Sequence, residues 1–186
     1  MTPRSTQPTA TANKLVGVMT LDSEQPTNGR GETEPYFTSI SYFPDGKQMV
    51  GGSMDNSVRR WDLQTGKEIV EARVVCELKV RAVAVSSDGR WVVTGGGATG
   101  RDSFGELKAW EIETQKMKTF EGHSSVVTCI DVSVDNKLLA SGSWDNTARI
   151  WDLNTGKLVA GPFECVNGYV SAVRFSQLDK IRISSQ

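Results

Sequence analysis

The chain has 186 residues, of which 38% are hydrophobic, and its 21 basic and 22 acidic side chains leave a net charge of -1. This composition is typical of a globular protein with one sizeable core. The near-neutral balance supplies no strong field for nucleic acid or an anionic membrane, so we expect neither as a partner.

The first segment, residues 1–13, is rich in Thr, Pro and Ser and lacks the apolar core of a signal peptide. We expect a flexible tail there, because such a composition buries too little surface to offset the entropy of ordering. Residues 14–35 predict a leading strand, KLVGVMTL at 14–21, followed by an extended loop. That strand resembles the last strand of a preceding repeat unit.

Four alternating apolar segments follow in chain order. They read TSISYFPDG, RAVAVSSDG, TCIDVSVDN and SAVRFSQLD, and each leads into a second short run, KQMVGG, RWVVTGG, KLLASGS or KIRISSQ. Alternation with a period of two predicts strands, and the Asp45-Gly46 and Asp88-Gly89 pairs predict tight hairpins between them.

A third strand in each unit carries a tryptophan. Trp61, Trp110 and Trp151 are separated by 49 and 41 residues, and the stretch SGSWDNTARIWDLNTGK agrees with GGSMDNSVRRWDLQTGK at 11 of 17 positions. The Thr-Gly turns after Trp61 and Trp151 lead into a fourth predicted strand, KEIVEA or KLVAG. The pattern predicts an all-β protein built from a repeated four-stranded unit.

These residues resemble the WD-repeat family, through Gly122-His123, Ser141, Asp145 and Trp151-Asp152. The resemblance implies a partial β-propeller of about three and a half four-stranded antiparallel blades over residues 36–186. We place the blades near 36–75, 79–121 and 124–163, with an incomplete blade at 168–186. The first copy has Gly51 in place of Ser141, and the second has no clear equivalent of Asp145.

His123, Ser141 and Asp145 also contain the ingredients of a nucleophilic triad. The resemblance implies a structural tetrad instead, in which Asp145, His123, Ser141 and the indole of Trp151 form one buried hydrogen-bonded chain. Such a chain satisfies groups that would each cost about 1–3 kcal/mol if buried without a partner. We therefore predict no enzyme activity, and we keep a serine hydrolase using Ser141 and His123 as an alternative.

The run from Gly95 to Gly100 matches G-x-G-x-x-G, but no helix N-terminus follows to face a phosphate. We interpret the run as an expanded hairpin loop. The acidic residues do not have the spacing of a calcium loop, and Cys76, Cys129 and Cys165 with a single histidine do not make a zinc site. We expect no cofactor and no metal. The three scattered cysteines favour a reducing compartment, the cytoplasm or alternatively the nucleus.

If the blades resemble WD-repeat blades, residues flanking His123 and Asp145 line an upper face around the central channel. These partner-binding candidates are Tyr36, Thr38, Met54, Lys79, Arg81, Val126, Thr128, Trp144, Tyr169 and Ser171. Trp144 is the main candidate because no role in a blade core explains an indole beside Asp145. The alternative is that it packs against a loop of a neighbouring blade.

The resemblance implies a non-catalytic scaffold or adaptor that presents this upper face to a protein or peptide, as in signalling complexes. A recognition segment of a signalling ATPase is a variant of this hypothesis. With too few blades to close a ring, the chain is also interpreted either as a fragment without independent function or as one half of a homo-oligomer that completes the propeller.

Overall fold

The computed structural model describes residues 37–69, 74–100, 103–166, 168–176 and 180–186, and these residues form strands and turns without a helix. The strands are β1 (Phe37–Tyr42), β2 (Gln48–Ser53), β3 (Ser57–Asp62), β4 (Val74–Val75), β5 (Val80–Val85), β6 (Trp91–Ala98), β7 (Phe104–Glu111), β8 (Met117–Thr119), β9 (Val127–Val132), β10 (Leu138–Ser143), β11 (Thr147–Asp152), β12 (Leu158–Glu164), β13 (Val170–Phe175) and β14 (Ile181–Ser185). The predicted all-β class is confirmed. The tail and leading strand predicted at 1–35 lie outside the described residues.

Consecutive strands pair antiparallel into separate sheets. Three sheets have four strands, in the orders β1-β2-β3-β4, β5-β6-β7-β8 and β9-β10-β11-β12, and β13 and β14 form a two-stranded sheet. We call these blades 1, 2 and 3 and half-blade 4. The fourth strand of blade 1, β4, lies at Val74–Val75, beyond the predicted KEIVEA. Of that predicted strand, the described residues 67–69 also contact β3, through a bridge between Trp61 and Glu68 and a hydrogen bond from the Ile69 N–H to the Arg60 carbonyl.

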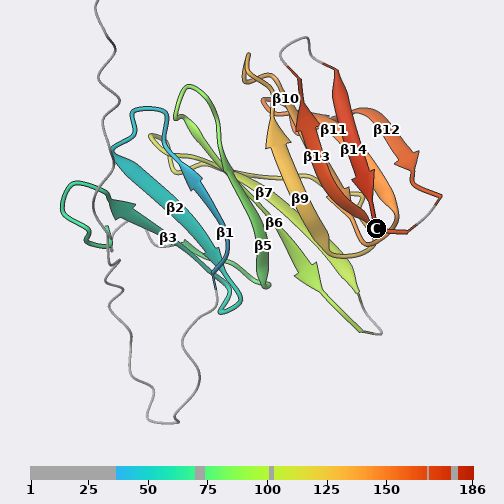
Figure 1. The fold of residues 1–186 in the computed structure, drawn as a ribbon, viewed down its shortest axis with the longest axis horizontal. Coiled ribbons are helices and arrows are strands. Elements are labelled where there is room, and N and C mark those ends of the chain that lie inside the picture. Colours follow the sequence, from blue (N-terminus) through green and yellow to red (C-terminus); the bar gives the residue numbers. More distant parts are fainter. Residues whose placement is uncertain (1–36, 70–73, 101–102, 167, 177–179) are drawn as a thin grey trace, which may run out of the picture.

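The first strands β1, β5, β9 and β13 run side by side, and the other strands of each blade extend outward from them (Figure 1). Segments of all four first strands line an open hollow of about 360 Å³, which corresponds to the expected central channel. The arrangement is an open arc of propeller blades, because the four sheets do not return to meet the first.

Apolar clusters hold successive blades together. One cluster joins blades 1 and 2 around Val50 and Val83, a second joins blades 2 and 3 around Leu107 and Trp151, and a third joins blade 3 to half-blade 4 around Val170. The alternation of side chains along each strand places one face of a blade against the blade before it and the other face against the blade after it.

Asparagines lie in tight turns of blades 1 and 3. Asn56, Asn136 and Asn146 have φ values of 66°, 58° and 63°, a left-handed conformation that asparagine tolerates better than most residues. The turns at Asn56 and Asn146 share one end of the molecule with the starts of the first strands. This end is the upper face, and it points toward the bottom of the view in Figure 1.

The β6–β7 hairpin of blade 2 is longer than its counterparts. Both strands have eight residues, whereas β2, β3, β10 and β11 have six. Of the glycine run interpreted as a hairpin loop, Gly95 to Gly97 lie inside β6 and Gly100 lies between β6 and β7, and no helix follows. A β-carbon on Gly96 would overlap the carbonyl oxygen of Lys79, and one on Gly97 would lie 3.0 Å from the Cα of Val126. The glycine run therefore allows close backbone packing, and it does not form the dinucleotide fingerprint.

No helix in the described part of the chain is long and apolar enough to cross a membrane.

Buried tetrad and candidate interaction face

The tetrad side chains of blade 3 form a continuous hydrogen-bonded chain. Trp151 Nε1 donates to Ser141 Oγ at 2.8 Å, Ser141 Oγ lies 2.8 Å from His123 Nε2, and His123 Nδ1 lies 2.8 Å from Asp145 Oδ2. Because a carboxylate only accepts, His123 donates from Nδ1 to Asp145, and in the neutral imidazole Nε2 then accepts from the serine hydroxyl. The chain links the loop before β9, strand β10, the β10–β11 turn and strand β11.

Asp145 is held as a carboxylate by its neighbours. Burial raises the pKa of this group, but the hydrogen bonds from His123 and Thr147, together with the backbone N–H of Ser124, oppose it and hold the pKa well below its usual range. Only 6% of the Asp145 side chain and 1% of the His123 side chain are exposed. The ion therefore anchors the turn to the blade, because its charge is satisfied by protein donors and shielded from solvent.

This geometry does not support nucleophilic catalysis. Ser141 is 0% exposed, and its hydroxyl is engaged by both His123 and Trp151. A serine nucleophile needs access to substrate, and a fully buried hydroxyl does not offer it. The arrangement is suited to holding one blade together.

Blade 1 places different chemistry at the equivalent positions. Gly51 lies opposite Arg59 in the register, as Ser141 lies opposite Arg149, so Trp61 has no hydroxyl to bond. Trp61 Nε1 is buried without a hydrogen-bond partner among the described residues. The ring of Phe37 packs edge-on against the indole, with centroids 5.1 Å apart.

The turn of blade 1 keeps its aspartate but pairs it differently. Asp55 accepts from Arg59 at 2.6 Å and from the Ser57 hydroxyl at 2.5 Å. Blade 2 has Thr94 at the serine position, opposite Lys108, and this lysine forms ion pairs with Glu77 and Glu106. The complete tetrad is thus present in blade 3 alone of the three described four-stranded blades.

Two of the partner-binding candidates bond neighbouring blades. The Thr38 hydroxyl donates to the carbonyls of Gly52 in its own blade and Val80 in the next, at 3.1 and 2.7 Å. Thr128 repeats this pattern with Gly142 and Val170, at 3.1 and 2.5 Å. Their hydroxyls thus serve the blade junctions.

Val126 was predicted to contact a partner, and the structure does not support that prediction. Its side chain is 0% exposed, because the stem of the long β6–β7 hairpin packs against this stretch of backbone. It cannot contact a partner in this conformation. The sequence signal for the hairpin was the separation of 49 residues between Trp61 and Trp110, against 41 for the next pair.

Arg81, Trp144 and Tyr169 come together from blades 2, 3 and half-blade 4. The Arg81 guanidinium lies 5.3 Å from the centroid of the Trp144 ring, and the Tyr169 ring meets the indole edge-on at 6.1 Å. Trp144 remains 39% exposed and Tyr169 37% exposed. Both readings of Trp144 thus have support, because the indole packs against neighbouring blades and still presents a large surface to solvent.

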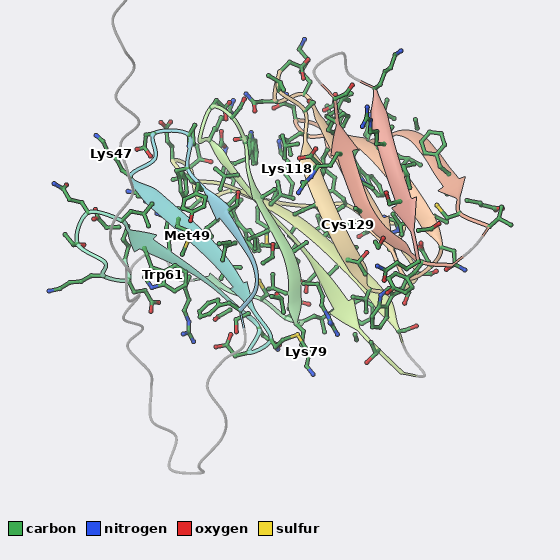
Figure 2. All side chains as sticks on the ribbon, in the orientation of Figure 1. Lys47, Met49, Trp61, Lys79, Lys118 and Cys129 are labelled. Carbon is green, nitrogen blue, oxygen red and sulfur yellow. The ribbon has the colours of Figure 1, made fainter. Side chains whose placement is uncertain are left out.

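The remaining candidates are dispersed. Lys79 is exposed at the start of β5, at the opposite end of the strands from Lys47 (Figure 2). Met54 is half-buried in the β2–β3 turn, and the Ser171 hydroxyl donates to the carbonyl of Ser184 in its own sheet at 3.2 Å. Tyr36 lies outside the described residues.

Within the described ranges, no group of three or more His, Cys, Asp and Glu side chains could hold a metal ion. Cys76, Cys129 and Cys165 are free thiols. Burial raises the pKa of the Cys76 thiol to about 12, so it is protonated at neutral pH and a poor metal ligand.

The comparison with known families agrees with this architecture. The model of the WD domain, G-beta repeat, matches residues 26–62, 74–103 and 114–152, more than half of the chain. The chain belongs to the WD40 repeat family, whose proteins are generally non-catalytic scaffolds that bind other proteins.

The chain is similar to curated proteins of the same family. It is 27% identical to Protein groucho of Drosophila melanogaster over 68% of this chain and 17% of that protein. It is 32% identical to Cilia- and flagella-associated protein 52 of Homo sapiens, and 33% identical to that of Sus scrofa, over 68% of this chain and 21% of each. The chain therefore aligns with about a fifth of the length of these relatives.

Proposed function

We propose that this chain is a non-catalytic protein-interaction module that presents its upper face to a protein or peptide. The observation that carries the proposal is the exposed pair of Trp144 and Tyr169, with Arg81 beside it, on a rim formed by rigid blades. Large aromatic side chains and arginine are the residue types most often responsible for binding energy at protein interfaces. Exposed aromatic surface held by a scaffold is available for such contacts.

A double substitution, Trp144→Ala with Tyr169→Ala, tests the proposal. We expect capture of a partner, identified by cross-linking to the unaltered chain, to fall by at least tenfold, because hot-spot truncations cost about 2 kcal/mol or more. Thermal unfolding of the same variant should be nearly unchanged, since both rings are more than a third exposed. Unaltered capture, or a large loss of stability, would contradict the proposal.

The serine hydrolase alternative has a separate test. A fluorophosphonate probe labels an activated serine, and we expect no labelling of this chain because Ser141 is buried. Ser141→Ala is the matched control, and labelling that disappears in this variant would establish the hydrolase.

We also propose that copies of the chain associate. Ile40 and Tyr42 on β1 are 54% and 59% exposed, and within the described residues β14 pairs only with β13. Exposed apolar side chains and open strand edges favour association, as in a ring completed by a second copy. Sedimentation across a range of concentrations should show mass above the 20.3 kDa monomer, and a compact monomer throughout would contradict this. A cytoplasmic or nuclear location is part of the same proposal, supported by the three free thiols.

A further inference from the structure

A pocket lies on the upper face between blades 1 and 2. Its walls are the β2–β3 turn of blade 1, the start of β5 and the long β6–β7 hairpin of blade 2, and its volume is about 270 Å³. The lining residues are Asn56, Leu78, Lys79, Arg81 and Gly97 to Thr99. The extra length of this hairpin supplies one wall of the pocket. The corresponding hairpins of blades 1 and 3 are shorter and supply no such wall.

The charge of this pocket is positive and uncompensated. Lys79 and Arg81 are its only charged lining residues, and within the described residues neither forms an ion pair or a side-chain hydrogen bond. Glu77, the carboxylate nearest in sequence, pairs instead with Lys108 Nζ at 3.0 Å. An anionic group placed here would find two cations that have no ion-pair or hydrogen-bond partner among the described residues.

The pocket is held in shape by backbone contacts. The Asn56 side-chain amide donates to the carbonyl of Glu77 at 3.2 Å, and the Cys76 N–H donates to the Asn56 carbonyl at 2.6 Å. On the other side, the Gly97 N–H donates to the Lys79 carbonyl at 3.3 Å, where the missing side chain of Gly96 permits the approach. A ligand therefore meets a preformed site and need not order it, which favours affinity.

Arg81 stands where the blade-junction pattern uses threonine. Thr38 and Thr128, at the equivalent positions of blades 1 and 3, each bond a carbonyl of the next blade. Arg81 makes no such bond among the described residues and reaches across the rim to the Trp144 ring. At this position blade 2 thus lacks the threonine hydrogen bond of blades 1 and 3 and has a cation on the upper face instead.

We propose that the pocket binds a carboxylate side chain of an acidic peptide segment, and that a neighbouring apolar side chain of the same segment packs on Trp144. Arg81 borders both places, so it connects the anionic contact with the aromatic one. This inference rests on the proposed interaction function and specifies the partner as an acidic, partly apolar peptide. A nucleic acid is disfavoured, because two cations on a chain of net charge -1 cannot follow a polyphosphate backbone.

Selection of a random peptide library on the immobilised full chain tests the inference. We expect the selected peptides to be enriched in Asp or Glu next to a large apolar residue. A fluorescent copy of the strongest peptide should lose about tenfold in affinity when its acidic residues become Asn or Gln, as expected for a charge-assisted contact. Its affinity should also fall as salt is raised.

Two substitutions in the protein locate the contact. Lys79→Ala and Arg81→Thr should each lower the affinity for the peptide about fivefold to tenfold. Lys47→Ala, which removes the same charge at the opposite end of the strands, is the matched control and should have no effect (Figure 2). Arg81→Thr should also keep or raise the thermal midpoint, because the threonine can supply the junction bond seen in blades 1 and 3. Weaker binding of the peptide by this variant therefore cannot be attributed to misfolding.

The outcomes separate this inference from the proposed function. Peptides enriched without acidic residues, or acidic peptides indifferent to both substitutions, would overturn the inference. If Trp144→Ala with Tyr169→Ala still abolishes partner capture in that case, the interaction function stands. No enrichment of any peptide would overturn the inference as well, and tighter binding of a single-stranded oligonucleotide than of any selected peptide would do the same.

Discussion

Blade 3 and blade 1 share most of one sequence motif but stabilise it by different means. In blade 3, four polar side chains satisfy one another from the indole of Trp151 to the carboxylate of Asp145. In blade 1, Gly51 removes the central hydroxyl, and Phe37 packs against the Trp61 indole whose N–H has no partner among the described residues. Blade 3 therefore uses hydrogen bonds between polar side chains where blade 1 uses packing between two aromatic rings.

The difference shows that the repeated tryptophan is primarily a packing residue. Trp61 and Trp151 are each 1% exposed whether or not the indole N–H is bonded. One neutral hydrogen bond contributes about 0.5–1.5 kcal/mol to stability, and burial of a tryptophan ring contributes more than that. The blade therefore tolerates loss of the serine as long as the ring stays buried.

The largest expected effect is loss of the histidine in blade 3. His123→Ala leaves the Asp145 charge and the Ser141 hydroxyl without their shared partner in a buried site. We expect the free energy of unfolding to fall by about 3 kcal/mol, measured by urea denaturation. Ser57→Ala in blade 1, which removes one donor to Asp55, is the comparison and should cost about 1 kcal/mol, because Arg59 still pairs with Asp55. Equal losses would refute the distinction between the two blades.

A second, intermediate effect is the acid dependence of stability. The pKa of Asp145 is lower in the folded chain than in the unfolded chain, so the ionised carboxylate stabilises the fold above the unfolded pKa. This contribution is lost as the pH falls below about 4 toward the folded pKa. The thermal midpoint of Asp145→Asn should lie below that of the unaltered chain at neutral pH, and the gap between the two midpoints should narrow as the solution is acidified. A gap that stays constant with pH would show that the carboxylate does not act through its charge.

The smallest expected effect concerns the missing hydroxyl of blade 1. A β-carbon on Gly51 would lie 3.0 Å from both Phe37 Cδ1 and Trp61 Cζ3. Gly51→Ser alone should destabilise the chain slightly, because the crowding offsets the new hydrogen bond. In a Phe37→Ala background the same change should stabilise it by about 1 kcal/mol, since the serine can then accept from Trp61. A double-mutant cycle measures the coupling, and additive effects would mean that Phe37 does not occupy the place of the serine.

Much of the fold was predictable from local patterns. Period-two alternation, the Asp-Gly and Thr-Gly turns and the recurring tryptophans predicted the strands and their grouping by four, because each of these signals acts within a few residues. The resemblance to WD repeats also implied the residues of the tetrad in blade 3. The fourth strand of blade 1 was less predictable. The sequence predicted it at KEIVEA, whereas β4 pairs with β3 at Val74–Val75, and such pairing is not a local property of the chain.

The candidate interaction face was only partly predictable. Arg81, Trp144 and Tyr169 were selected from their positions in the repeat, yet the same rule selected Val126, which the β6–β7 hairpin buries. It also selected Thr38 and Thr128, whose hydroxyls bond the next blade. Repeat position specifies the end of the blade where a side chain lies, but the exposure of that side chain depends on the neighbouring blade.

The sequence alone therefore determined the repeating four-stranded unit, because strand alternation and turn chemistry are local properties of the chain, whereas the resemblance to WD repeats implied the tetrad residues. The tertiary structure decided which side chains remain available to solvent, and it brought Asn56, Lys79 and Gly97 around one pocket. These contacts join residues far apart in sequence, so they depend on how blades 1 and 2 pack and on the length of one hairpin.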